Sequence, residues 1–166
     1  MSVHIRPSTA ADVSALREVR LLALADEPDA FGSTYEESLT YPAQRWVDMA
    51  TTFNYFLAFD GDLAVGMASG GRFSPYPDAR WLYGMFVRPE YRGTGVAVDL
   101  VRAVADWVRA QHVRTLGLHV TTSVARARAF YEKLGFVEFG APEPMERDHS
   151  LFLQVMLTDV DTNELI

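Results

Sequence analysis

Two periods of hydrophobic residues alternate along this chain, and each change of period marks the end of a strand or a helix. Apolar side chains at every second position, or short apolar runs, predict strands, whereas apolar side chains at every third or fourth position predict helices. About seven strands are expected, at residues 3–6, 55–59, 63–70, 81–87, 116–120, 136–139 and 151–157. About four helices are expected, at residues 9–25, 42–49, 96–111 and 125–134.

Capping and turn residues support several of these boundaries. Ser8 and Thr9 suit the N-cap of the first helix, and Ser33 and Glu36 have the spacing of a capping box in a less regular stretch that follows it. Asp60-Gly61-Asp62 predicts a hairpin turn between two strands. Gly135 stands where a left-handed residue would end the last helix.

The order of these elements predicts the fold class. A strand, a helix and a further strand at residues 81–120 imply a parallel pair, because the chain crosses back over the sheet. The hairpins imply antiparallel neighbours. We therefore predict an α/β or α+β fold, with helices covering a mixed sheet. No repeat or linker-like tract interrupts the chain, so residues 1–166 are expected to form a single domain.

Composition narrows the functional classes. The 166 residues are 49% hydrophobic and 22% charged, which is typical of a soluble globular protein. The absence of cysteine excludes a disulfide scaffold, a thiol nucleophile and a thiolate zinc site. A net charge of −7 argues against nucleic-acid binding and favours a cationic partner. No apolar run has the length of a signal peptide or a membrane span, so we expect a cytoplasmic protein without membrane contact.

Histidines give no sign of a metal centre. The four histidines are not spaced as metal ligands, and no metal is expected. His119 lies on the strand predicted at 116–120, where it either approaches a site or is an ordinary sheet histidine. His149 lies with acidic neighbours in a loop expected before the last strand. That loop either lines a site or carries solvated charges.

The loop at residues 88–97 carries the clearest chemical signal. A buried strand ends, two glycines follow, and a helix begins. Helix-start amides point outward with a partial positive charge, and glycine lets an anion approach them, so the loop suits a diphosphate. Arg88 and Arg92 would add charge-assisted contacts. The alternative is a tight turn with solvated arginines. The segment lacks a Gly-Lys-Ser/Thr motif and the third glycine of the dinucleotide fingerprint.

Three segments resemble the GNAT family of N-acetyltransferases. Arg92-x-x-Gly95-x-Ala97 resembles the family signature Q/R-x-x-G-x-G/A. The stretch ARAFYEKLGF at 127–136 resembles the family's A…Y-E-K-L-G-F segment, and IRPSTAAD at 5–12 resembles its I-R-x-A-x-x-x-D start. The resemblance covers nearly the whole chain. It implies a mixed, mostly antiparallel sheet of about seven strands flanked by about four helices.

The resemblance implies acetyl transfer from the cosubstrate acetyl-CoA to a primary amine, most simply of a small molecule. Since the chain has no thiol to hold the acetyl group, direct transfer in a ternary complex is expected. The alternatives are a protein or peptide N-acetyltransferase, or a CoA-binding regulatory protein without catalysis. By position, the resemblance makes Tyr131 the residue that gives a proton to the departing thiolate. It implies that cofactor is bound by Met85, Phe86, Val87, Arg92, Gly93, Thr94, Gly95, Val96 and Ala97. A homodimer is common among relatives.

The chain departs from the family pattern in two places. Many relatives carry a CoA-contacting asparagine seven residues before the tyrosine, where this chain has Val124, and Ser123 is a substitute. Relatives often carry a general base on the strand before the glycine loop. Residues 80–87 hold no acid here, so a base elsewhere or a chain of waters would remove the amine proton.

Acceptor-side residues are expected in two segments. Phe31, Glu36 and Glu37 lie in the irregular region after the first helix, which relatives use to cover the acceptor. The simpler interpretation is that Glu36 caps a helix and Glu37 faces solvent. Tyr83 alternates with Met85 on its strand, so both face either an acceptor pocket or the core.

Overall fold

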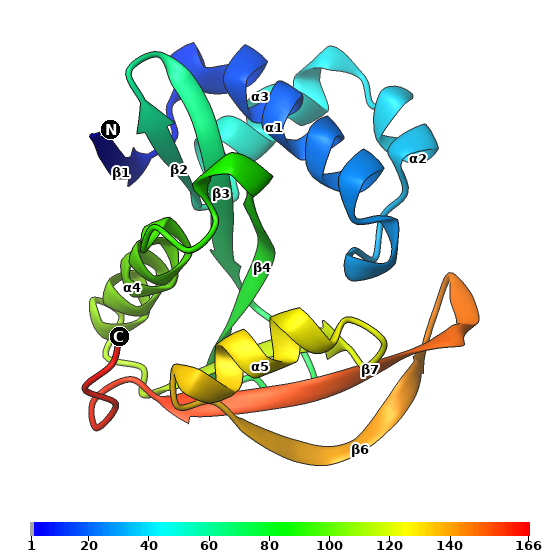
Figure 1. The fold of residues 1–166 in the computed structure, drawn as a ribbon, viewed down its shortest axis with the longest axis vertical. Helices are drawn as coiled ribbons and strands as arrows, with labels where there is room; N and C mark the ends of the chain where they lie inside the picture. Colours follow the sequence, from blue (N-terminus) through cyan, green and yellow to red (C-terminus); the bar gives the residue numbers. More distant parts are fainter. Residues whose placement is uncertain (1) are drawn as a thin grey trace.

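The computed structural model describes residues 2–166 and contains a seven-stranded sheet with the order β1-β2-β3-β4-β5-β7-β6 (Figure 1). Neighbouring strands are antiparallel except for β4 and β5, which are parallel, as the strand–helix–strand unit predicted. The strands are β1 (Val3–Pro7), β2 (Tyr55–Asp60), β3 (Leu63–Gly71), β4 (Ala79–Val87), β5 (Thr115–Thr121), β6 (Val137–Met145) and β7 (Asp148–Asp159).

Five α-helices accompany the sheet, one more than the periodicity predicted. They are α1 (Val13–Asp26), α2 (Tyr35–Leu39), α3 (Ala43–Thr52), α4 (Val96–Arg109) and α5 (Ala125–Lys133). Short 3₁₀ turns occupy Ala10–Asp12, Pro28–Ala30 and Pro89–Tyr91. Within residues 2–166 no helix is long and apolar enough to cross a membrane.

The additional helix α2 corrects the predicted capping box by one residue. Thr34, not Ser33, accepts a hydrogen bond from the backbone N–H of Glu37, and the Glu37 carboxylate accepts from the backbone N–H of Thr34. Both pairs have the same spacing, so spacing alone does not distinguish them. A single turn of helix is also too short to show an apolar period.

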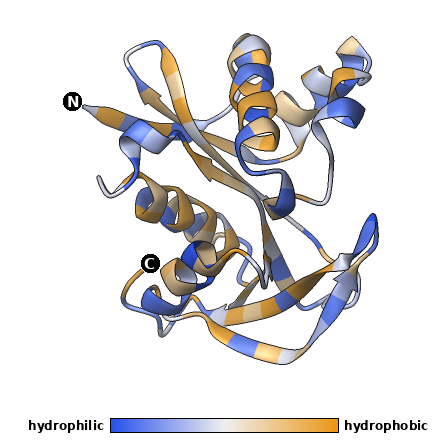
Figure 2. Cartoon of the chain, turned by 45° about the vertical axis from the view of Figure 1, so that its right-hand side comes forward, coloured by the Kyte–Doolittle hydropathy of each residue, from blue (hydrophilic) through white to orange (hydrophobic). Residues whose placement is uncertain are grey.

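Two hydrophobic clusters lie on the two faces of the sheet (Figures 1 and 2). Helices α1 and α3 cover one face of β2–β4, whereas α4 covers the other, and Figure 2 shows hydrophobic central strands between striped helices. Leu100 and Val104 of α4 and Leu16 of α1 are completely buried. Burying one such side chain contributes roughly 1.5–3 kcal/mol. The apolar helix faces therefore fix both layers against the sheet.

Strand β4 pairs with β5 only at its start. The pairing runs from Ala79 opposite Thr115 to Leu82 opposite Leu118, and ends there. At Gly84 the backbone takes φ +62°, which L side chains rarely adopt, and the register between β3 and β4 shifts nearby. Beyond Leu82 the two strands diverge, and side chains from both line the cavity that opens between them.

The loop expected before the last strand is instead a long hairpin. Strand β6 continues to Met145 and β7 begins at Asp148, so only Glu146 and Arg147 separate them. All residues of β6 before Met145 are exposed, and two are prolines, as is typical of an edge strand. Such a strand has no buried face to produce an alternating pattern. His149 is exposed at the start of β7, outside the cavities described below.

Candidate functional site

The glycine loop after β4 presents an uncapped helix start. Gly93 and Gly95 have φ +77° and +91°, and a Cβ on either residue would meet no atom within 4 Å. Gly95 is the N-cap of α4, and no side chain accepts from the amides of the first turn. These amides and the positive end of the helix dipole therefore face open space, which is the geometry that binds an anion.

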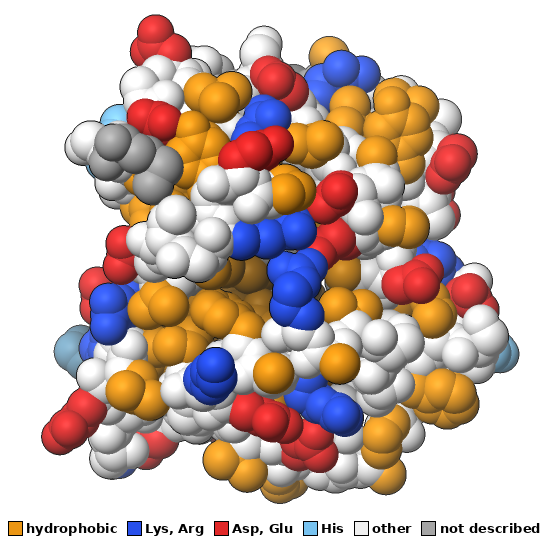
Figure 3. All heavy atoms as spheres, viewed as in Figure 1, with side chains coloured by type: hydrophobic (Ala, Val, Ile, Leu, Met, Phe, Trp, Pro, Cys, Tyr) orange, Lys and Arg blue, Asp and Glu red, His pale blue; other side chains and the backbone are white. Residues whose placement is uncertain are grey.

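A cavity of about 480 Å³, the loop cavity, lies between this loop, α4 and the start of α5 (Figure 3). Figure 3 shows a hollow with hydrophobic walls and basic side chains beside it. Its lining is Glu27, Met85, Phe86, Val87, Arg92, Gly93, Gly95, Ala97, Val98, Arg126, Ala127, Phe130 and Tyr131. Of the cofactor residues inferred from the sequence, Thr94, Val96 and Ser123 lie outside this lining. Val96 is buried in the core, and the Thr94 hydroxyl donates to the Tyr91 carbonyl.

Ion pairs connect the sides of the loop cavity. Arg92 donates to Asp26 at 3.1 Å and lies 3.5 Å from Glu27, which also pairs with Arg126. Arg88, the other arginine expected at an anion, instead donates to a β3 carbonyl and pairs with an acid of α1. Sequence reasoning missed Glu27 and Arg126, because their pairing spans 99 positions. Arg92 and Arg126 are thus the guanidinium groups beside the glycine loop.

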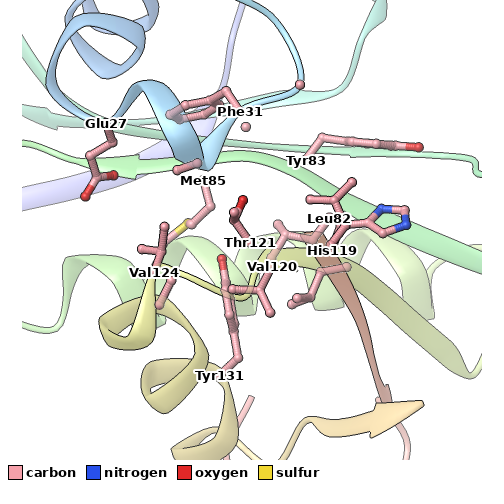
Figure 4. A pocket seen from close by; sticks show the side chains of 16 residues that line it. Glu27, Phe31, Leu82, Tyr83, Met85, His119, Val120, Thr121, Val124 and Tyr131 are labelled. Atoms are coloured by element: carbon pink, nitrogen blue, oxygen red, sulfur yellow. The ribbon is translucent and has the colours of Figure 1, made fainter. Parts of the chain in front are cut away.

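A second cavity of about 240 Å³, the central cavity, continues from the loop cavity through shared residues (Figure 4). The two cavities share Glu27, Met85, Ala127 and Tyr131. Tyr131 is only 7% exposed, and its ring packs edge-on against Phe130 and Phe136. Figure 4 shows its hydroxyl directed into the cavity. Burial raises the pKa of this hydroxyl well above its usual value, so it stays protonated. Tyr131 therefore serves both as a packing residue and as a hydrogen-bond donor to the cavity.

Hydrogen bonds from distant elements hold the roof of the central cavity, residues 28–32. The Thr121 hydroxyl donates to the Asp29 carbonyl at 2.7 Å. Arg147, at the tip of the β6–β7 hairpin, donates to the carbonyls of Pro28 and Phe31. Phe31 is thereby fixed in the wall of the central cavity, and its contact with an acceptor stays a prediction.

The structure also places three residues whose roles the sequence left open: Val124, Ser123 and His119. Val124 lines the central cavity, whereas Ser123 is exposed and lines none of the cavities described here. His119 also lines the central cavity, but its Nδ1 accepts a hydrogen bond from the Trp81 indole at 3.0 Å. Burial lowers the pKa of His119, while Glu143 acts in the opposite direction. With Nδ1 occupied and Nε2 carrying the proton, the neutral ring does not act as a base there.

A third cavity of about 590 Å³, the arginine cavity, adjoins the central cavity. Three arginines and no acid line it. The two cavities share Phe31, Gly32, Tyr83 and Gly84. The expected Tyr83 therefore lies at their junction. Its hydroxyl donates to the backbone carbonyl of Arg72 at 2.8 Å.

The two glutamates predicted at the acceptor side lie away from the cavities. Glu36 and Glu37 are exposed on α2 and line none of the three cavities. Glu37 closes the capping box with Thr34, a role that the simpler interpretation had given to Glu36. Within residues 2–166, no group of three His, Cys, Asp or Glu side chains is placed to hold a metal ion.

The comparisons with known proteins all identify acetyltransferases. The profile of the Acetyltransferase (GNAT) family matches residues 18–136. The L-methionine sulfoximine/L-methionine sulfone acetyltransferase of Pseudomonas paraeruginosa is 28% identical over 146 residues, which are 82% of this chain and 81% of that protein. The mycothiol acetyltransferase of Beutenbergia cavernae is 29% identical over 130 residues, which are 77% of this chain and 42% of that protein. The structure of yncA from Salmonella typhimurium, assigned as an acetyltransferase and solved with its cofactor acetyl-CoA, has a TM-score of 0.76 at 19% identity and covers 97% of this chain and 95% of its own.

Proposed function

Because the chain belongs to the acetyltransferase (GNAT) family, we propose that it transfers the acetyl group of acetyl-CoA directly to the primary amine of a small molecule. One observation carries the proposal: Tyr131 lines both the loop cavity and the central cavity. A thioester in the first cavity and an amine in the second would therefore meet beside one protonated hydroxyl.

The residues around the loop cavity fit acetyl-CoA. The amides at the start of α4 and the guanidinium of Arg92 suit the pyrophosphate. Residues 83–87 of β4 have no partner strand on the β5 side. Apart from the Val87 carbonyl, which accepts from Arg92 Nε at 3.1 Å, the main-chain groups that face this side are open to the amides of the pantetheine arm. Phe86 and Phe130 supply apolar walls for that arm. When the pyrophosphate binds, it replaces part of the ion pairing between Arg92 and Asp26.

The reaction needs a deprotonated amine and a stabilised leaving group. An alkyl ammonium has a pKa near ~10 and must lose a proton before its nitrogen attacks the thioester carbon. The C–N bond forms as the C–S bond breaks, and the nitrogen loses a second proton as it becomes an amide. Through water in the central cavity, this proton replaces the one that the thiolate takes up to leave as free CoA. The Tyr131 hydroxyl donates to the departing sulfur. Since burial keeps it protonated, it is a hydrogen-bond donor over the whole physiological pH range.

The proton lost by the amine passes to water in the central cavity. Glu27 is the one carboxylate that lines this cavity, and it is already paired with Arg92 and Arg126. His119 has its acceptor nitrogen occupied by Trp81. Neither group therefore offers a free base, which agrees with the lack of an acid on β4.

The acceptor is a small molecule and not a polypeptide segment. Hydrogen bonds from Thr121 and Arg147 hold the roof at residues 28–32 in place beside the central cavity, which favours a compact acceptor over a long one. The two relatives described above are named for small molecules, L-methionine sulfoximine or sulfone and mycothiol. The assay of thiol release from acetyl-CoA tests peptide acceptors as well as small amines.

Replacing the tyrosine hydroxyl tests this function. Thiol release from acetyl-CoA is followed with a panel of amines and peptides, and every thiol detected belongs to CoA because the chain has no cysteine. We expect Tyr131→Phe to lower kcat by about 100-fold or more, since proton donation contributes about 10²–10⁴. CoA affinity should be retained. Tyr35→Phe, outside all three cavities, is the matched control.

Two results would contradict the proposal. CoA binding without thiol release for any amine or peptide would leave only a CoA-binding protein. An unchanged kcat in Tyr131→Phe would remove this residue from the chemistry.

A further inference from the structure

Three arginines gather in the arginine cavity of a chain whose net charge is −7. Arg20, Arg45 and Arg72 line this cavity, and no aspartate or glutamate does. Within residues 2–166 none of the three forms an ion pair, whereas eight other arginines do. Positive charges that line one cavity repel each other, and an anion bound among them would relieve this repulsion.

Arg20 lies where the arginine cavity meets the central cavity. Its Nη1 donates to the Tyr55 hydroxyl at 3.2 Å, while its Nε is buried without a hydrogen-bond partner. The same Nη1 lies 3.7 Å from the position of a Cβ built on Gly84, a residue that lines both cavities. A buried donor without a partner destabilises the protein unless a ligand satisfies it.

Arg45 and Arg72 complete the positive wall. Arg45 stacks over Tyr41 and Phe53, with its guanidinium carbon 4.9 and 5.5 Å from the ring centroids. This stacking fixes the guanidinium without neutralising it. The pKa of Arg80 is lowered, chiefly by burial and further by the charge of Arg72. Arg72 itself is exposed and lies close enough to Arg80 for its charge to act there.

A carboxylate is the anion that matches this wall. It is planar and compact, and it accepts two parallel hydrogen bonds from a guanidinium. A carboxylate at Arg20 lies at the junction of the cavities, so an amine on the adjacent carbon extends past Gly84 into the central cavity. The side chain of such a molecule would then occupy the rest of the arginine cavity, between Phe53 and Tyr83.

We propose that the acceptor is a free α-amino acid whose carboxylate binds in the arginine cavity and whose α-amine enters the central cavity. This inference rests on the proposed acetyltransferase function and adds the substrate class. It also refines an expectation drawn from the total charge. The negative net charge favoured a cationic partner, whereas the arginine cavity is lined by positive charges and by no acid.

Pairs of acceptors that differ only in the carboxylate test this inference separately from the proposed acetyltransferase function. Acetylation rates are measured for the standard L-amino acids and for the α-carboxamide of each. The carboxamide is the weaker base and has more free amine at neutral pH, so without carboxylate recognition it would react at least as fast. We expect kcat/KM to favour the acids by about 10- to 100-fold, as for the loss of a charge-assisted hydrogen bond.

Arginine variants locate the carboxylate. Arg20→Gln and Arg45→Gln should each bring the ratio of acid to carboxamide kcat/KM down about 10-fold or more, mainly through KM. Arg45 is exposed on α3, so its variant is expected to fold even if Arg20→Gln does not. Arg17→Gln, one helical turn before Arg20 and outside all three cavities, should keep the wild-type ratio.

The outcomes distinguish two failures. Acetylation of amines with no preference for acids, or a ratio unchanged in Arg45→Gln, overturns the carboxylate site and leaves the proposed function standing. If no amine or peptide gives thiol release, the proposed function is overturned. The carboxylate site is then judged by calorimetric binding of the same acids and carboxamides, and equal binding of both overturns it.

Discussion

At the scale of single residues, Asp12 shows how one carboxylate joins two elements. It is 5% exposed, and its two oxygens accept from both Nη atoms of Arg6 at 2.7 and 2.9 Å. It also accepts from the backbone N–H of Thr9, which closes the capping box before α1. The Arg6 hydrogen bond lowers the pKa of Asp12 to about 2 although burial acts to raise it. Strand β1 and helix α1 are thus tied together through an ionised group.

Asp12→Asn is therefore expected to destabilise the fold at neutral pH by about 2 kcal/mol, since charge-assisted hydrogen bonds are lost. Because the folded pKa lies below the unfolded one, the contribution of Asp12 is present above about pH 4 and is lost as the pH falls towards 2. Urea unfolding of both proteins at pH 7 and at the lowest pH where each stays folded measures this. Asp99→Asn, in an exposed pair with Arg102, should change little.

Residues of the site were predictable where they share one motif. Tyr131 lies within the continuous segment 127–136, so its pattern is visible in the sequence alone. Arg20, Arg45 and Arg72 come from α1, α3 and the end of β3, and no spacing along the chain connects them. Only the folded sheet brings them to one cavity. The same holds for Glu27 and Arg126.

At the scale of elements, the turn from β4 into α4 is set by glycine. Gly95 has φ +91°, and the space beside its Cα is open. Gly61, in the β2–β3 turn, has φ +60° and also has open space around it. Both positions therefore require a residue that tolerates positive φ, but of the two only Gly95 lines the loop cavity.

This pair gives a matched test of the glycine loop. Gly95→Val and Gly61→Val should each cost about 1–2 kcal/mol of stability, because a β-branched residue is forced into a left-handed conformation. Only Gly95→Val should also weaken CoA binding, by about 10-fold or more, since its side chain enters the anion site. Isothermal calorimetry with CoA measures both variants. Equal CoA affinity in the two folded proteins would refute the loop as the cofactor site.

Elements with one buried face were predictable, and those without one were not. The run 96–111 matches α4 closely because its apolar stripe is buried from end to end. Strand β6 exposes nearly every side chain, and its pairing with β7 rests on the main chain. Helix α2 has only five residues. In both cases backbone hydrogen bonding decides the structure, and hydrophobic patterning does not report it.

At the scale of the whole molecule, the loop and central cavities lie where β4 leaves β5. Helices α1 and α3 pack on the part of the sheet formed by β1–β4, and α5 packs on the part formed by β5–β7. The strands of the two parts pair at four positions, between β4 and β5. Acetyl-CoA is proposed to bind beside this junction, between the glycine loop and α5. A ligand that contacts both parts only in the folded state stabilises that state by mass action.

Cofactor should therefore raise the stability of the whole chain. At a CoA concentration about 100 times Kd, the free energy of unfolding should rise by about 2.7 kcal/mol. Thermal unfolding over a series of CoA concentrations measures the shift. Gly95→Val at the same concentrations should show a smaller rise in Tm. A wild-type Tm that is independent of CoA would contradict binding at this junction.

The loop cavity and the arginine cavity have no lining residue in common, and each shares residues with the central cavity. With acetyl-CoA and the acceptor bound as proposed, the two substrates would reach the point of reaction by separate entrances. Neither substrate would then close the entrance of the other, and the geometry would impose no compulsory order of addition. Free CoA would also leave by its own route while the acetylated product is still held.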